Sequence, residues 1–152
     1  MISTEELVGK FKGILEELLA RTKASRTTLR LDVPERGFHV NGVVAEALGS
    51  GVKSIATETS LQQRKSQTAS YLEQHRKILV QNDCANAIPS PPKELMQIYG
   101  TKAQMLVPVV RGADMVGWLS VHYNPSTREW SREDVVALET ALAATHKQLD
   151  KM

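Results

Sequence analysis

The sequence predicts an α+β fold, in which a central antiparallel sheet carries helices on its faces. Its composition is that of an ordinary globular domain, since 41% of the 152 residues are hydrophobic and 24% are charged. Helical periodicity marks the two ends of the chain, and strand-like segments lie between them in adjacent pairs. Adjacent pairs favour hairpins over parallel βαβ units, and therefore an antiparallel sheet.

The first helix is predicted over residues 4–21. Ser3 followed by Glu6 forms a capping-box pattern, in which the hydroxyl and the carboxylate each satisfy a backbone N–H. Apolar residues recur at three- and four-residue spacings, which predicts a helix with one buried face. The residues of this face are Leu7, Phe11, Ile14, Leu15, Leu18 and Leu19.

Two strands are predicted next, over residues 27–33 and 38–47. Apolar and polar residues alternate along the first, which is typical of a half-buried strand. Pro34 ends this strand, and a Gly-Ser-Gly loop at 49–51 follows the second. We expect the two strands to pair as a hairpin.

The middle of the chain is more polar. Residues 60–75 are compatible with a helix that covers a surface rather than filling a core. A short strand is predicted over residues 77–83, followed by the proline-rich loop IPSPP and a short helix over residues 93–99, closed by Gly100. The sizeable or apolar anchors of the polar helix are Leu61, Ala69, Tyr71 and Leu72.

Residues 103–111 and 115–124 give the most regular pattern, two strands joined by a short turn. Pro108 indicates an edge or a bulge, because proline has no N–H for a central ladder. Ser131, supported by Asp134, caps a final helix. The apolar seam of that helix consists of Val135, Leu138, Leu142, Thr145 and Leu149.

A narrow apolar seam suits a second helix. We therefore expect the terminal helices to pack on one face of the sheet, while the polar segment at 60–75 closes the other. Unless the first helix covers the whole seam, apolar surface stays exposed in a monomer. The sequence accordingly predicts a homodimer formed through the terminal helices.

Composition argues against several classes of function. A net charge of +2 without a basic stripe argues against nucleic acid as a partner. Cys84 is the single cysteine, which excludes an intramolecular disulfide, and the four histidines lack metal-ligand spacing. No apolar run reaches the roughly 20 residues of a membrane span, and the N-terminus does not resemble a secretory signal. We expect a soluble, cytoplasmic protein without a membrane partner.

The stretch MLVPVVRGADMVGWLSVHYNPSTREWSREDVVALETALA resembles the second half of a GAF domain. The earlier VVAEALGSGV, at residues 43–52, resembles the second strand of that family and its following loop. Together the resemblance covers most of residues 24–147. It implies a GAF-like domain over 1–152, with an N-terminal helix at 1–22, sheet and pocket at 24–130, and a C-terminal helix at 131–151. The most similar members are short bacterial proteins with one such domain.

The resemblance implies a ligand pocket on the sheet face opposite the terminal helices. Family members bind cyclic nucleotides, bilins, haem, formate, 2-oxo acids or aromatic compounds, so the resemblance leaves the ligand and any cofactor unidentified. A few members are free methionine sulfoxide reductases, whose chemistry needs two cysteines. Cys84 stands alone and outside their H-x-x-C context.

Other catalytic patterns are also missing, including the G-x-S-x-G elbow, the H-E-x-x-H helix and the phosphate-binding Walker loop. We therefore expect a binding module rather than an enzyme. Catalysis by a Cys84 and His122 pair would require the two side chains to meet in the fold. Bilin attachment through Cys84 is a further hypothesis, although covalent members place a histidine beside that cysteine.

His122 is the first candidate ligand-binding residue. On the strand at 115–124, alternate residues Trp118, Ser120 and His122 form a polar and aromatic face with hydrogen-bonding capacity. The resemblance supports this choice, because bilin-binding members have a ligand-facing histidine at the corresponding strand end. The alternatives are a histidine satisfied by backbone or solvent, and a Trp118 that packs under the covering helix.

Further candidates come from neighbouring segments. Gln104 and Leu106 share the side of their strand that the family pattern turns toward the pocket. Tyr71 and His75, one helical turn apart, either cover the pocket mouth or pack on the helix surface. Asp83 and Cys84 precede a loop, from which side chains often reach ligands; otherwise they are a turn-capping carboxylate and an inert buried thiol.

Glu46 either faces solvent or supplies a buried acceptor. The pI of 8.7 favours an anionic ligand or an aromatic acid.

The sequence thus predicts a small-molecule-binding sensory domain, and the alternative is a dimerisation or adaptor module with a collapsed pocket. The set of Trp118, Ser120, His122 and Gln104 favours the sensor, because a collapsed pocket should be filled with Leu and Phe.

Overall fold

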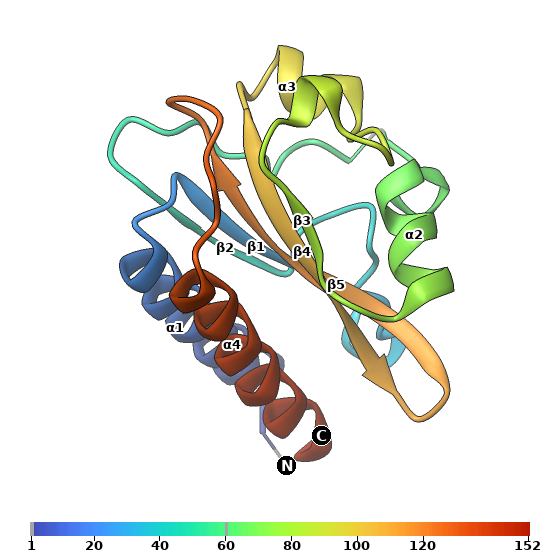
Figure 1. The fold of residues 1–152 in the computed structure, drawn as a ribbon. Helices are drawn as coiled ribbons and strands as arrows, with labels where there is room; N and C mark the ends of the chain where they lie inside the picture. Colours follow the sequence, from blue (N-terminus) through green and yellow to red (C-terminus); the bar gives the residue numbers. More distant parts are fainter. Residues whose placement is uncertain (1, 60) are drawn as a thin grey trace.

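The computed structural model describes residues 2–59 and 61–152 and shows an α+β fold, as predicted (Figure 1). One antiparallel sheet has the strand order β2-β1-β5-β4-β3. Its strands are β1 Arg26–Leu31, β2 Ala45–Leu48, β3 Leu79–Gln81, β4 Ala103–Arg111 and β5 Asp114–Tyr123. The helices are α1 Thr4–Thr22, α2 Gln67–His75, α3 Lys93–Gln97 and α4 Arg132–Asp150. Short 3-10 turns lie at Pro34–Arg36, Gln63–Lys65 and Cys84–Asn86.

The helices α1 and α4 lie side by side on one face of the sheet, as predicted (Figure 1). Phe11 of α1 and Leu138 of α4 are fully buried in the main hydrophobic core. The sheet contributes side chains such as Leu29 and Leu119 to the same core. The seam of α4 therefore packs on α1 and the sheet within one chain. The predicted capping box at Ser131 and Asp134 is also present.

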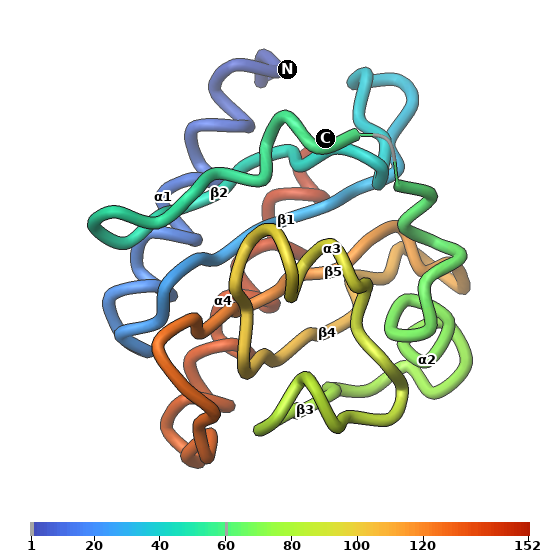
Figure 2. The backbone as a smooth tube through the Cα atoms, turned by 90° about the horizontal axis from the view of Figure 1, so that it is seen from above, coloured from blue at the N-terminus to red at the C-terminus, as the bar shows by residue number. Residues whose placement is uncertain are grey.

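A second layer covers the opposite face. Figures 1 and 2 place α2 on the other side of the strands from α1. Ala69 and Leu72 of α2 pack with Trp118 in a separate hydrophobic cluster. Arg64 links this layer to the sheet by two contacts. Its Nε lies 2.8 Å from Asp32 Oδ2, and its Nη2 donates a hydrogen bond to the Met115 carbonyl. The polar segment thus covers a face, as predicted.

Two predictions about the first strands need correction. The second strand, predicted over 38–47, is only Ala45–Leu48, because the chain before it crosses to the covered face and buries Val40 there. The Val40 N–H donates to Asp32 Oδ1, which holds the crossing in place. The β1 strand, predicted as half-buried, is buried on both faces, since the cover lies over its polar side. The antiparallel pairing of β1 with β2 is confirmed.

The β4–β5 hairpin agrees closely with the prediction. The turn between them contains Gly112, whose φ of 62° lies in the left-handed region that favours glycine. A bulge interrupts the β4–β5 register between Val109 and Val110, one residue beyond Pro108. The β3 strand ends opposite Leu106, so Pro108 lies where β4 has no β3 partner. Both expectations for this proline, an edge and a bulge, are thus met.

Candidate ligand-binding site

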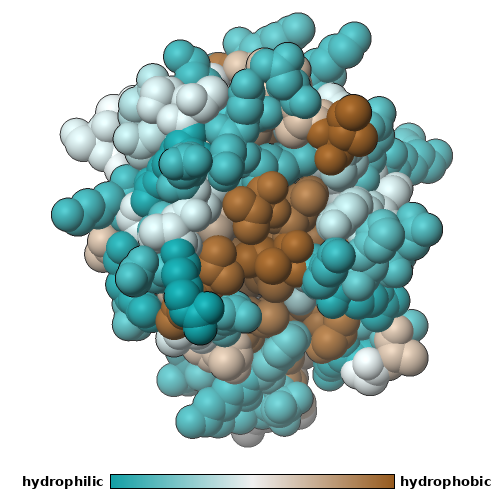
Figure 3. Space-filling view, viewed as in Figure 1, coloured by the Kyte–Doolittle hydropathy of each residue, from teal (hydrophilic) through white to brown (hydrophobic). Residues whose placement is uncertain are grey.

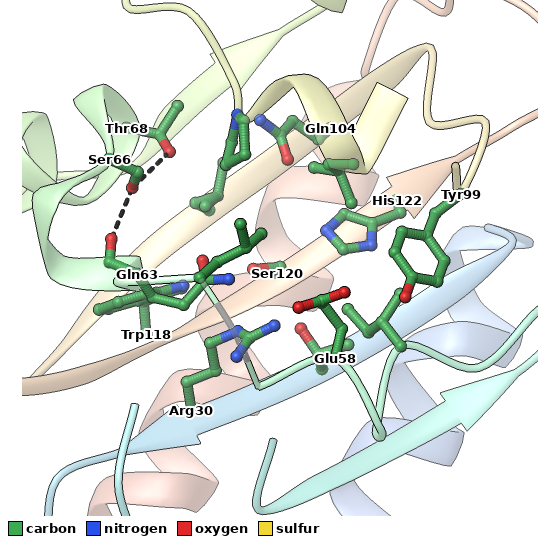
Figure 4. A pocket seen from close by; sticks show the side chains of 16 residues that line it. Arg30, Glu58, Gln63, Ser66, Thr68, Tyr99, Gln104, Trp118, Ser120 and His122 are labelled. Carbon is green, nitrogen blue, oxygen red and sulfur yellow. Dashed lines mark hydrogen bonds between the residues drawn. The ribbon is translucent and has the colours of Figure 1, made fainter. Parts of the chain in front are cut away.

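A cavity lies between the sheet and its covering layer (Figure 4). The space not filled by atoms in and around it amounts to about 520 Å³, a figure that includes open solvent. The strands β1, β4 and β5 form its floor, and α3 and the segment before α2 form its walls and roof. The lining residues are Thr28, Arg30, Ile55, Glu58, Leu61, Gln63, Ser66, Thr68, Pro92, Leu95, Tyr99, Gln104, Leu106, Trp118, Ser120 and His122.

The register of β1 and β5 sets the order of the floor. Arg30 lies opposite Trp118, and Thr28 lies opposite Ser120. One step further along the same face, His122 lies opposite Arg26 on β1. Alternate residues of a strand share a face, so these side chains all project toward the cover. The guanidinium of Arg30 and the imidazole of His122 therefore occupy different levels of one cavity floor.

His122 is held by a buried arginine. Arg26 Nη1 lies 3.1 Å from His122 Nδ1, while Arg26 Nε and Nη2 donate to the Lys53 carbonyl. A guanidinium only donates, so Nδ1 is the acceptor and the proton of the neutral ring resides on Nε2. Burial, together with the positive charges of Arg26 and Arg30, holds the pKa of His122 well below its ordinary value. His122 is thus a fixed neutral donor through Nε2.

Gln104 is oriented by a second chain of hydrogen bonds. Gln81 Nε2 donates to the Pro89 carbonyl, and Gln104 Nε2 donates to Gln81 Oε1. Because a carbonyl only accepts, the Pro89 oxygen fixes the orientation of both amides. Gln104 Oε1 is buried and has no hydrogen-bond partner within residues 2–59 and 61–152. The register places Gln104 directly opposite His122, so an acceptor and a donor stand side by side in the cavity.

Arg30 brings a charge into the cavity. Its side chain is 5% exposed, and its pKa is lowered to about 10, mainly because burial disfavours the charged form. The carboxylates of Glu46 and Glu58 act in the opposite direction. Arg30 Nη1 donates to the Val40 carbonyl. A buried guanidinium that lines a cavity is a site for an oxygen ligand.

Five of the nine predicted site residues line the cavity: His122, Trp118, Ser120, Gln104 and Leu106. They come from β4 and β5, where the alternation of the strands placed them on one face. Trp118 also packs against α2 in the second hydrophobic cluster, so the packing alternative holds together with the cavity-lining one.

The other four lie outside the cavity lining. Tyr71 and His75 stack on each other with ring centroids 4.3 Å apart on α2. Asp83 accepts a hydrogen bond from Asn86, as expected for a turn-capping carboxylate. Cys84 is buried, and burial raises the pKa of its thiol to about 12, the opposite of a nucleophilic cysteine. Nothing in this placement brings Cys84 to His122.

Sequence reasoning missed the residues of β1 and of the cover. Arg30 and Thr28 stood on the polar side of a strand predicted to be half-buried, so they were not considered as ligand contacts. The pattern that points to them is the matching polar face of the neighbouring β5. Glu58 and Tyr99 lie in segments without clear periodicity. Glu46 does not line the cavity; its carboxylate accepts from the Ser54 hydroxyl and the Ile55 N–H.

The buried His122 predicts a dependence of stability on pH. Its folded-state pKa lies below the ordinary 6.5, so the unfolded chain takes up a proton first as the pH falls. This contribution to stability is present above pH 6.5 and is lost below it. We expect a loss of about 1.4 kcal/mol in unfolding free energy between pH 7.5 and 5.5. Urea denaturation at the two pH values measures it.

The matched variants are His122→Gln and His75→Gln. His122→Gln removes the buried imidazole, so the extra loss of unfolding free energy at pH 5.5 should be absent in this variant. The second removes an exposed histidine and should keep the loss of the native chain. Equal pH dependence in the native chain and in His122→Gln would contradict the assignment of a buried neutral imidazole.

Two properties of the described chain concern other kinds of site. No group of three or more His, Cys, Asp or Glu side chains within residues 2–59 and 61–152 is arranged to hold a metal ion. No helix in those same ranges combines the length and hydropathy required to cross a bilayer.

This combination of a central antiparallel sheet, terminal helices on one face and a covered cavity on the other defines the GAF architecture. A model of the GAF domain family matches residues 6–145. The chain therefore belongs to the GAF domain family, and the resemblance in its second half is confirmed. No curated protein sequence matches the chain significantly.

Solved structures share the fold at low sequence identity. The GAF domain of the cyanobacteriochrome TePixJ is 14% identical with a TM-score of 0.76, over 95% of this chain and 89% of that one. GAF3 of Slr1393 from Synechocystis sp. PCC6803, in its photoproduct state, is 15% identical with a TM-score of 0.71, over 95% of this chain and 97% of that one. The chromophore-binding domain of the bacteriophytochrome RpBphP3 from R. palustris is 18% identical with a TM-score of 0.72, over 95% of this chain and 56% of that one.

Proposed function

We propose that this chain is a sensory domain that binds a small molecule in the cavity between sheet and cover and acts as a homodimer. One observation carries the proposal. Thr28 Oγ1 and Gln104 Oε1 line the cavity, are buried, and have no hydrogen-bond partner among the described residues. Each buried unpaired polar atom costs roughly 1–3 kcal/mol, and a ligand that bonds to both removes that cost. Solved structures with this fold include a phycocyanobilin-bound GAF domain of a cyanobacterial phytochrome and the chromophore-binding domain of RpBphP3, which supports a bound small molecule here.

The strands connect the cavity to the helices. Thr28 faces the cavity, and the hydroxyl of its neighbour Thr27 donates to the Leu15 carbonyl of α1 at 2.8 Å. If β1 can adopt two placements and the ligand binds one of them more tightly, the ligand shifts β1 toward that placement. Because β1 is hydrogen-bonded directly to α1, the shift reaches the helix. Such coupling follows only from a difference in affinity between two states. The cytoplasm is the proposed compartment.

A thermal-shift screen tests ligand binding. Organic acids, nucleotides and aromatic compounds are added to the native chain, to Ser120→Leu, which fills the cavity, and to Ser126→Leu in an exposed loop. A ligand at a hundredfold over its Kd stabilises by about 2.7 kcal/mol and raises Tm by several degrees. The shift should vanish in Ser120→Leu and persist in Ser126→Leu. An absence of any shift across the library would instead favour an adaptor without ligand.

Exposed apolar side chains beside the terminal helices support the homodimer. Val136 of α4 is 40% exposed and Val80 of β3 is 42% exposed. Figure 3 shows an apolar area on this face, where Figure 1 places α4 next to β3. A groove between α1 and α4, lined partly by Ile14 and Ala141, adds further apolar surface.

Analytical ultracentrifugation tests the homodimer. The native chain should sediment as a dimer at tens of micromolar. Val136→Glu should give a monomer, because a charge cannot be buried unpaired in an apolar interface. The control Ile88→Glu changes an apolar residue that is 95% exposed in the loop after β3 and should remain dimeric. A monomeric native chain would contradict the homodimer and leave the ligand proposal intact.

A further inference from the structure

The cavity offers two chemically different ends. At one end Arg30 turns its guanidinium inward from β1, with Glu58 as an electrostatic neighbour. At the other end Gln104 and His122 face each other across β4 and β5. Figure 4 shows Arg30 and Gln104 on opposite sides of the cavity, with Ser120 between them.

The far end has a fixed polarity. His122 presents Nε2–H as a donor, because its Nδ1 accepts from Arg26. Gln104 presents Oε1 as an acceptor, because its Nε2 donates to Gln81. A single hydroxyl satisfies both, since it accepts from Nε2–H and donates to Oε1. A methyl group or a hydrogen atom at this position would leave both buried groups unpaired.

The near end is suited to an anion. The guanidinium of Arg30 lines the cavity and presents its N–H groups as a planar fork, which matches the two oxygens of a carboxylate. Glu46 does not fill this role, since its carboxylate is taken up by Ser54 and Ile55. Thr28, whose buried hydroxyl has no partner in the described part of the chain, lies beside Arg30 on the same face of β1.

Apolar and aromatic side chains line part of the space between the two ends. Trp118 and Leu106 from the sheet and Leu95 and Tyr99 from the cover contribute to its walls. Arg30 lies level with Trp118, four residues before His122, which is about 13 Å along the strand. A ligand that contacts both Arg30 and His122 must span the part of this distance that the two side chains leave open, so probes of different length are needed.

We propose that the ligand is a hydroxyaryl carboxylate, with its carboxylate on Arg30 and its hydroxyl between His122 and Gln104. This inference rests on the proposed ligand-binding function and names the substrate class of the same cavity. Arg26 acts through His122 as a positioning residue. Glu58 opposes the incoming carboxylate, because two like charges then share one guanidinium.

Isothermal titration calorimetry with defined probes tests the proposal. The acids are 4-hydroxybenzoate, 4-hydroxyphenylacetate and 3-(4-hydroxyphenyl)propionate, which differ in length. At least one should bind, and its analogue without the hydroxyl should bind at least about tenfold more weakly. The neutral carboxamide analogue should lose a similar factor. Binding of acid and amide with equal affinity, or binding of none of the three acids, would overturn the proposal.

Variants assign the two ends. Arg30→Met should abolish the preference for acid over amide, and Gln104→Leu should abolish the preference for the hydroxyl. Glu58→Gln should strengthen acid binding severalfold and leave amide binding unchanged, a gain that misfolding does not produce. Tyr71→Phe, outside the cavity lining, should bind like the native chain. Weaker acid binding in Glu58→Gln would contradict the carboxylate position on Arg30.

The thermal-shift screen distinguishes a wrong ligand class from a failure of ligand binding itself. If other library compounds bind and Ser120→Leu abolishes their binding, the sensory function stands and only the hydroxyaryl carboxylate is wrong. If no compound binds, the ligand-binding function itself fails. The tautomer of His122 gives an independent readout of the positioning role of Arg26. Nitrogen NMR should show a proton on Nε2 in the native chain and a mixture of tautomers in Arg26→Met.

Discussion

Gly117→Ala is expected to destabilise the chain by at least about 3 kcal/mol, because there is no space for one added carbon atom. A Cβ at this position would lie 1.8 Å from the carbonyl oxygen of Arg30 and 2.9 Å from the Cα of Leu31. Both are backbone atoms of β1, which cannot turn aside as a flexible side chain would. The strands β1 and β5 would have to separate where they carry Arg30 and Trp118 into the cavity. Urea denaturation measures the loss.

The same substitution in α1 provides the control. Gly13 is in the middle of the helix, and a Cβ there would meet nothing within 4 Å. Alanine should therefore raise the unfolding free energy by about 0.5–1 kcal/mol, because glycine is the weaker helix former. Opposite signs for the two variants are the expected result. A cost below about 1 kcal/mol for Gly117→Ala would show that β1 and β5 are further apart than described.

Phe11→Ala is expected to cost about 3–5 kcal/mol. Phe11 is fully buried in the main core, where α1 and α4 meet the sheet, and its removal leaves a cavity among packed side chains. Lys12, the next residue, is exposed, so Lys12→Ala should change stability by less than about 0.5 kcal/mol. Thermal or urea unfolding of the two variants measures the difference.

The Phe11→Ala variant also separates the two faces of the sheet. Its cavity forms on the helical face, while the ligand site lies on the covered one. The fraction that remains folded should therefore keep the ligand affinity of the native chain. A stability loss below about 1 kcal/mol would contradict the placement of α1 over the sheet. A selective loss of affinity would show that the helical core couples to the ligand site more strongly than through the Thr27–Leu15 hydrogen bond alone.

Helices and hairpin strands were predictable because their residues repeat with a period. The α1 helix, predicted over 4–21, extends to Thr22, and β4 has the predicted bounds. Local patterns of this kind depend on neighbours in sequence. The segment before β2 was predicted as a strand because it is rich in β-branched residues. Its path is set by tertiary contacts, including the hydrogen bond from Val40 to Asp32.

The candidate site was only half predictable for a related reason. Strand alternation identified Ser120, His122 and Gln104, since one parity of β4 and β5 is polar. Arg30 likewise lies on the polar side of an alternating strand, β1, but a polar side chain on a strand usually faces water. Its burial depends on the cover, which is joined to the sheet by contacts far apart in sequence. The pairing of Gln104 with His122 likewise requires the register between strands, which no single strand contains.

Native mass spectrometry of the freshly purified chain, compared with its mass after denaturation, tests the central claim most directly. The proposed function predicts a native species that carries an additional small mass, which denaturation releases and which Ser120→Leu lacks. The released compound then identifies the ligand, and a hydroxyaryl carboxylate is the expected class. A native species of unmodified mass, which gains no mass from any compound of the screening library, would contradict ligand binding in this cavity.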